Sequence, residues 1–142
     1  MTATSITYVR RGELQNFFMD FPNNKELTLD FATLAPEERG GTAKKFLAAS
    51  AVSCFCSALS GALLARGAEY SEIRGSASVE TGLDDKKRAR VQKIILHVEV
   101  VMSDDFEDVF ERCKKIMEPG CLITASLEPG IRVEHKVRLI HE

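Results

Sequence analysis

Four cysteines are the residues of this 142-residue chain with the clearest potential for chemistry. Cys54 and Cys56 lie in a stretch without charge at 46–65, Cys113 lies in a later periodic segment, and Cys121 opens a short apolar run. Two thiols that meet in a fold can cycle between dithiol and disulfide, and a thiolate can attack an electrophilic atom. The elements that carry the cysteines decide which of them can react and which only fill the core.

The composition is that of one globular domain spanning 1–142, with 44% hydrophobic and 28% charged residues. A net charge of -2 and a pI of about 6.0 favour neither nucleic acid nor an anionic membrane as a partner. The N-terminal segment has no apolar signal-peptide core, so we expect a cytoplasmic protein with reduced thiols. The cysteine spacing matches no zinc pattern, so we expect no metal site and no cofactor.

The uncharged stretch 46–65 predicts a long helix of about six turns, which Thr42 can cap and Gly67 can close. Its length would also suffice for a membrane span. However, it is rich in Ala and Ser, and the alternating segments around it need a core to cover. The sequence therefore favours a central helix buried on all sides over a span.

Cys54 and Cys56 cannot bond each other within this helix, because they point about 200° apart. Cys56 falls among ordinary core residues and is expected to be a small buried side chain. Cys54 falls on a stripe of small residues, which leaves room beside its thiol. The stripe consists of Ala43, Leu47, Ser50, Ala51, Ala58, Gly61 and Ala65.

Cys121 follows Pro119 and Gly120 and opens the run "CLITASL", which fits the first turn of a helix. Backbone N–H groups and the helix dipole at that position favour a thiolate. The alternative, in which Cys121 merely fills a gap, is equally open on the sequence. Cys113 lies on an i, i+3, i+4, i+7 apolar stripe that starts at Phe106 and is expected in the core.

The segments predict an α+β fold with the order βββ-α-ββ-α-β. About six mainly antiparallel strands would wrap around the long central helix, and a second helix would start after an N-cap at Ser103. The expected strands lie at 5–11, 14–21, 26–31, 70–80, 90–102 and 131–140.

At these residues the chain resembles the osmotically inducible protein C and organic hydroperoxide resistance proteins (OsmC/Ohr). The run "KKFLAASAVSCFCSAL" is similar to the central-helix motif of that family, which places the reactive cysteine at Cys54. "CLITASL" is similar to the second-cysteine motif, which places the other thiol at Cys121. The order of strands and helices also matches along essentially the whole chain.

The resemblance implies a cysteine-based peroxidase in oxidative-stress defence. One of the two thiols would attack an organic hydroperoxide, the pair would close to a disulfide, and a dithiol reductant would restore it. The resemblance also implies an intertwined homodimer with an apolar pocket at the subunit interface. It leaves open which of Cys54 and Cys121 is attacked first.

Two positions depart from the family pattern. The family usually has a Glu about ten residues before the reactive cysteine, paired with an Arg that stabilises the thiolate. Here Lys44 or Lys45 holds that position, and Arg10 and Arg11 are both candidates for the Arg. Lys44 could still lower the thiol pKa by its charge. The family usually has Pro after the second cysteine, where this chain has Leu122.

Two other functions remain open on the sequence. The chain could be a redox sensor or a binder of small apolar ligands without turnover, or a structural dimerisation module with four inert thiols. His97 and His135 lie in predicted strands and are interpreted as structural or exposed rather than catalytic. Glu37 and Glu38, in the linker before the long helix, could replace the missing carboxylate.

Overall fold

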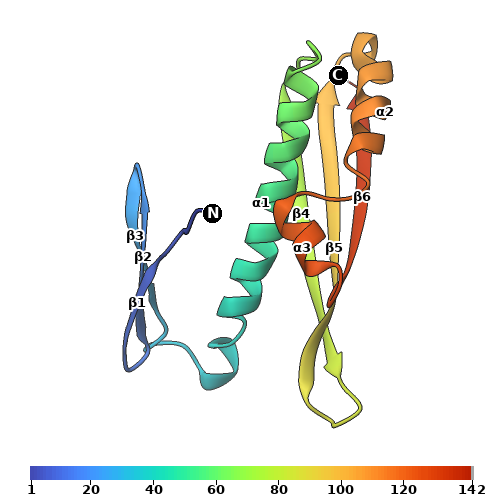
Figure 1. Ribbon diagram of the computed structural model, residues 1–142. Coiled ribbons are helices and arrows are strands. Elements are labelled where there is room, and N and C mark those ends of the chain that lie inside the picture. Colours follow the sequence, from blue (N-terminus) through green and yellow to red (C-terminus); the bar gives the residue numbers. More distant parts are fainter. Residues whose placement is uncertain (142) are drawn as a thin grey trace. The chain divides into compact units, whose positions relative to one another are not determined.

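The computed structural model describes residues 1–141, which form two units, Met1–Thr42 and residues 43–141 (Figure 1). Each unit has its own internal contacts. That the whole chain is one domain stays a prediction.

The first unit is a three-stranded antiparallel meander of β1 (Thr7–Arg11), β2 (Leu14–Phe21) and β3 (Asn24–Asp30). Gly12 provides the left-handed residue of the first tight turn, with a φ of 62°. A short 3-10 helix, η1 (Pro36–Glu38), follows. The meander predicted from the alternating segments is confirmed.

The long helix α1 (Thr42–Leu64) starts at the residue predicted to cap it and is closed by Gly67 as predicted. Gly67 has a φ of 73°, and the Ala68 N–H donates to the Leu63 carbonyl at 3.1 Å. This six-to-one bond, with Ala68 fully buried, is the pattern of a Schellman C-cap.

Within the chain, α1 buries one face and not all of them, which corrects the prediction of a helix buried on every side. Ala51, Phe55, Leu59 and Leu63 are fully buried in the core. The opposite face, which includes Ser57 and Gly61, stays exposed. The stretch Pro36–Leu64 is long and apolar enough to cross a membrane, a test that core helices also pass. The buried face of α1 is the arrangement of a core helix.

The second sheet has the order β4-β5-β6, with β4 (Glu72–Leu83), β5 (Ala89–Met102) and β6 (Arg132–His141). β4 and β5 are antiparallel, whereas β6 runs parallel to β5 because two helices lie between them in the chain. One face of β5 is fully buried in the core that α1 shares. Its residues there are Ile94, Leu96, Val98, Val100 and Met102.

The connection from β5 to β6 holds the other helices. Ser103 accepts a hydrogen bond from the Asp105 N–H and caps η2 (Asp104–Phe106), which leads into α2 (Glu107–Ile116). This confirms the predicted cap. The run "CLITASL", expected to start with the first turn of a helix, contains α3 (Leu122–Leu127), which the predicted order βββ-α-ββ-α-β did not include.

Candidate thiol site

Cys121 is the N-cap of α3, as its place after Gly120 suggested. Its sulfur accepts a hydrogen bond from the Thr124 N–H at 3.5 Å, while the Cys121 N–H donates to the Thr124 hydroxyl at 2.9 Å. This reciprocal bonding is a capping box in which a sulfur replaces the usual oxygen. The sulfur is thereby held at a point toward which backbone N–H groups are directed.

The Thr124 side chain is fully buried and links Cys121 to β6. Its hydroxyl lies 3.4 Å from the Cys121 sulfur and 3.2 Å from Nε2 of His135. The His135 ring in turn stacks on Phe55 of α1, with ring centroids 4.6 Å apart. Residues from α1, α3 and β6 therefore form one connected cluster around the sulfur.

Cys54 lies in the same cluster, so the structure brings together the two cysteines that the sequence singled out. The Cys54 and Cys121 thiols lie close enough for each to shift the pKa of the other, and the Ile123 backbone N–H lowers the pKa of both. Both thiols are free, so the described state is the reduced one. The start of α3 is thus directed at two sulfurs at once.

The two sulfurs differ in how readily they ionise. Burial raises the pKa of Cys54, and so does the neighbouring Cys121 thiol. For Cys121, burial also disfavours the charged form, but several hydrogen bonds oppose it. The Thr124 hydroxyl, the Thr124 N–H and the Cys54 thiol together leave the pKa of Cys121 below its ordinary value. Within residues 43–141, Cys121 is therefore the sulfur better prepared to be a thiolate.

The other two cysteines, Cys113 and Cys56, pack in or against the hydrophobic core. Cys113 is fully buried in the core, as its stripe on α2 predicted. Cys56 is partly buried and packs against the core beside Gly75 of β4. Burial raises its pKa, as does the nearby Cys121 charge. The prediction that Cys56 is a buried core residue is therefore confirmed only in part.

The basic residues predicted to stabilise a thiolate are not assembled around Cys54 within the second unit. Lys44 is exposed and lies ten residues before Cys54, about 15 Å along the axis of α1. Arg10 and Arg11 belong to the first unit, where Arg10 bonds the Gly12 carbonyl at 2.8 Å and Glu13 at 3.4 Å. Their role at the thiols stays a prediction.

The predicted carboxylates also belong to the first unit. Glu38 accepts a hydrogen bond from the Ala35 N–H at 3.1 Å and thereby caps η1, whereas Glu37 is exposed on that short helix. An arginine that the sequence analysis did not consider, Arg39, lies 3.7 Å from Glu13. Arg10 and Arg39 thus share one carboxylate.

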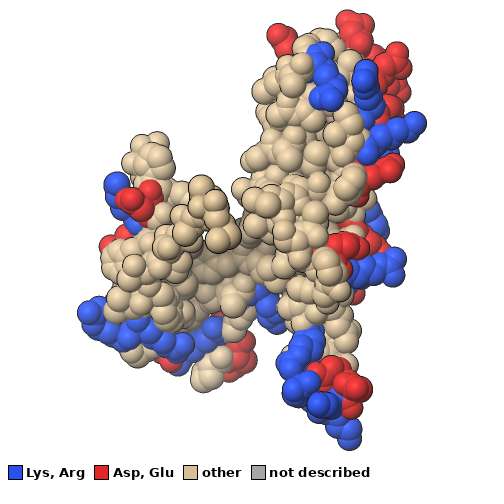
Figure 2. Space-filling model, viewed as in Figure 1, with Lys and Arg blue, Asp and Glu red and all other residues tan. Residues whose placement is uncertain are grey.

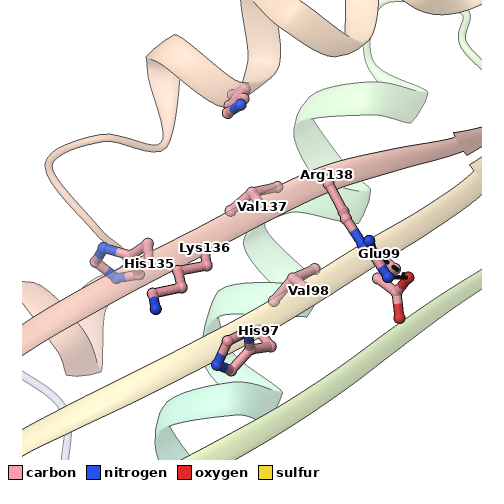
Figure 3. A pocket seen from close by; sticks show the side chains of 8 residues that line it. His97, Val98, Glu99, His135, Lys136, Val137 and Arg138 are labelled. Atoms are coloured by element: carbon pink, nitrogen blue, oxygen red, sulfur yellow. Dashed lines mark hydrogen bonds and ion pairs between the residues drawn. The ribbon is translucent and has the colours of Figure 1, made fainter.

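A pocket of about 560 Å³ lies over β5 and β6, and His135 is one of its lining residues (Figure 3). Three cationic side chains, Lys114, Lys136 and Arg138, also line it, with Glu99 bound to Arg138 at 2.9 Å. His97 is exposed, as predicted for a strand histidine. Among residues 1–141, no group of three or more His, Cys, Asp or Glu side chains could hold a metal ion.

The surface of the second unit is divided by charge. No Lys, Arg, Asp or Glu occurs between Phe46 and Leu64, so the exposed side of α1 is uncharged beyond Lys44 and Lys45 in its first turn. On the face seen in Figure 2, most charged side chains of this unit lie along the side formed by α2 and β6 and at the β4–β5 turn, and a few lie at the ends of α1. An uncharged exposed helix face of this kind is typical of a surface that another protein covers.

Sequence reasoning missed two members of the cluster, Thr124 and His135. Thr124 carried a signal in the sequence, since a polar residue three positions after a helix N-cap completes a capping box. His135 carried none, because only the parallel pairing of β6 with β5 brings its ring to Thr124.

The comparisons with known proteins agree with this architecture. A family model described as OsmC-like protein matches residues 36–136. An OsmC-like protein from Mycoplasma pneumoniae superposes with a TM-score of 0.73 at 14% identity, covering 99% of this chain and 97% of that one. No curated protein matches.

Two solved structures described as organic hydroperoxide resistance proteins share the fold. The one from Legionella pneumophila has a TM-score of 0.61 at 17% identity, covering 98% of this chain and 97% of its own. The one from Elizabethkingia anophelis has a TM-score of 0.62 at 17% identity and covers 99% of both chains. Since the family model spans most of the chain, including both cysteines of the cluster, this chain belongs to the OsmC-like protein family.

Proposed function

We propose that this protein is a thiol peroxidase that reduces organic hydroperoxides through a Cys54–Cys121 disulfide cycle. The observation that carries the proposal is that Cys54 lies beside Cys121, whose sulfur caps α3, is hydrogen-bonded to Thr124 and has a lowered pKa. Family membership and the organic hydroperoxide resistance proteins of the same fold support a role in redox or peroxide defence.

The proposed chemistry balances with a hydroperoxide and a dithiol as the only co-reactants. A thiolate attacks the distal oxygen, the O–O bond breaks, and the alkoxide leaves with a proton as alcohol. The sulfenic acid so formed is attacked by the second sulfur, an S–S bond forms, and hydroxide leaves as water. A dithiol then reduces the disulfide and is itself oxidised to a disulfide.

The lowered pKa of Cys121 suits it to the closing step and to reduction. A thiolate attacks the Cys54 sulfenic acid readily, and a sulfur of low pKa is the better leaving group when a reductant opens the disulfide. The first attack by Cys54 requires a positive group that counteracts its raised pKa. Arg10 is our preferred candidate over Arg11 and Lys44, because the Glu13 carboxylate orients its guanidinium.

We further propose that the protein works in the cytoplasm as a homodimer, with no nucleic acid or membrane as partner. The uncharged exposed face of α1 supports the dimer, since a second copy would remove this surface from water. Such an interface would also place an apolar surface near Cys54, which an alkyl hydroperoxide needs.

The proposal is tested by the consumption of cumene hydroperoxide in the presence of dithiothreitol. The wild type and Cys56→Ser should consume many equivalents per protein, whereas Cys54→Ser and Cys121→Ser should each lose turnover. Cys56→Ser is the matched control, because it removes a partly buried thiol from the same helix. If the wild type reacts only once per molecule, a sensor without turnover is the better description; if the Cys54 and Cys121 variants turn over normally, the thiol cycle is wrong.

A further inference from the structure

The Thr124 hydroxyl has three hydrogen-bond neighbours, which is its full capacity. A hydroxyl offers one hydrogen and two acceptor lone pairs. The Cys121 N–H, at 2.9 Å, can only donate, so it occupies one lone pair. One lone pair and one hydrogen therefore remain for the Cys121 sulfur at 3.4 Å and for Nε2 of His135 at 3.2 Å.

Whether Nε2 of His135 carries a hydrogen decides which neighbour receives the Thr124 hydroxyl hydrogen and which faces the remaining lone pair. When Nε2 carries a hydrogen, it donates to the Thr124 oxygen, and the hydroxyl hydrogen turns to the Cys121 sulfur, which favours the thiolate. When Nε2 is bare, it accepts the hydroxyl hydrogen, and only a lone pair is left for the Cys121 thiol, which favours the protonated sulfur. Protonated His135 always produces the first arrangement, because both its ring nitrogens then carry hydrogens.

The rest of the cluster keeps this arrangement in place. The Phe55 ring stacks on the His135 ring, and Thr124 is fully buried, which limits the access of water to the Thr124 hydroxyl. The titratable groups that face Cys121 are Cys54 and Cys56 from α1 and His135 from β6. Glu128, after α3, raises the pKa of His135. The pocket that His135 lines also holds other titratable groups, which are His97 and Glu99 of β5, Lys114 of α2, and Lys136 and Arg138 of β6.

We propose that Thr124 and His135 are positioning residues that set the charge of the Cys121 sulfur through one shared hydroxyl hydrogen. The inference rests on the proposed function, in which the Cys121 thiolate closes the disulfide and later leaves from it. It gives the protein a response to acidification: protonation of His135 directs the hydroxyl hydrogen to the sulfur and supports the thiolate where low pH would otherwise protonate it.

The test is an NMR titration of the reduced protein with ¹³C labels in cysteine and histidine, without peroxide. In the wild type, the Cys121 signal should show its own titration and a second inflection where His135 titrates. Thr124→Val, of the same shape but without the hydroxyl, should lose that inflection and, at a pH at which His135 is protonated, lower the ratio of thiolate to thiol by about tenfold or more. Thr124→Ser should retain both features.

Direct attraction between the His135 and Cys121 charges would leave the inflection in Thr124→Val, so that result overturns the proposal. If Thr124→Val does not fold, His135→Gln provides the test, because its amide donates near the Nε2 position but does not titrate. The inflection should then vanish while the thiolate remains. An unchanged inflection in His135→Gln would contradict the proposal.

Peroxide consumption separates this inference from the proposed function. Normal titrations without turnover would leave the inference standing and reject the peroxidase. Peroxide turnover together with a Cys121 titration that does not change in the Thr124 and His135 variants would reject the inference but not the proposed function.

Discussion

Replacing Gly120 with alanine should disturb the thiol site without removing any of its polar groups. Gly120 has a φ of 89°, in the left-handed region that residues with a side chain rarely adopt. A Cβ atom there would lie 2.5 Å from the Thr124 hydroxyl oxygen and 3.2 Å from the Ala125 nitrogen. The hydroxyl would have to move, and the bond it accepts from the Cys121 N–H would be lost.

The expected loss of stability follows from these two effects. The left-handed backbone costs a residue with a side chain about 1–2 kcal/mol. A lost hydrogen bond between buried groups costs about 0.5–1.5 kcal/mol more. We therefore expect Gly120→Ala to lower the free energy of unfolding by about 2–3 kcal/mol.

Urea unfolding followed by circular dichroism measures this change. With a slope of about 1–3 kcal/mol per molar urea, the midpoint should fall by about 0.7–3 M. Gly130→Ala is the matched control, because Gly130 has no atom within 4 Å of a new Cβ and no left-handed φ. If Gly120→Ala shifts the midpoint no further than Gly130→Ala, the described packing of Gly120 against Thr124 is wrong.

Three more predictions follow from the second unit. Gly75→Ala should lower the free energy of unfolding in urea by about 1–3 kcal/mol, because the new Cβ would lie 2.6 Å from the Val52 side chain. A change below about 0.5 kcal/mol would contradict the close packing of β4 on α1. Burial lowers the pKa of His135, although Glu128 opposes this, so the unfolded chain binds this proton more tightly. The free energy of unfolding should therefore fall as the pH drops through about 6.5. His135→Phe should show a smaller fall between pH 7 and 5 than the wild type. Equal pH dependence of the wild type and His135→Phe would refute this role of His135. Ser57→Lys places a charge on the exposed face of α1 and should convert the proposed dimer to monomer in sedimentation velocity without loss of helicity; a wild type that sediments as a monomer rejects the dimer.

Features governed by local sequence could be predicted well. Gly67 ends α1, Ser103 caps the helix region before α2, and Cys113 is buried on the predicted stripe. Each depends on neighbours within a few turns of the same chain segment. The candidate pair Cys54 and Cys121 was likewise visible, because both lie in segments whose residue types resemble a known family.

Features that depend on distant contacts could not be predicted. The exposed side of α1 has the same small, uncharged residues as a buried one, so composition could not reveal that a single chain covers only one face. The sequence interpretation of His135 as an ordinary strand residue missed its place beside Thr124 for the same reason. The ring reaches the thiol site only through strand pairing and the stacking on Phe55.

The central claim is that Cys54 and Cys121 form the reactive pair, and mass spectrometry of the thiols tests it most directly. The reduced protein is treated with one equivalent of cumene hydroperoxide without reductant, and its peptides are mapped. We predict the loss of two thiols and a peptide that links Cys54 to Cys121, with Cys56 and Cys113 still reduced. Four free thiols after treatment, or a link through Cys56 or Cys113, would contradict the account.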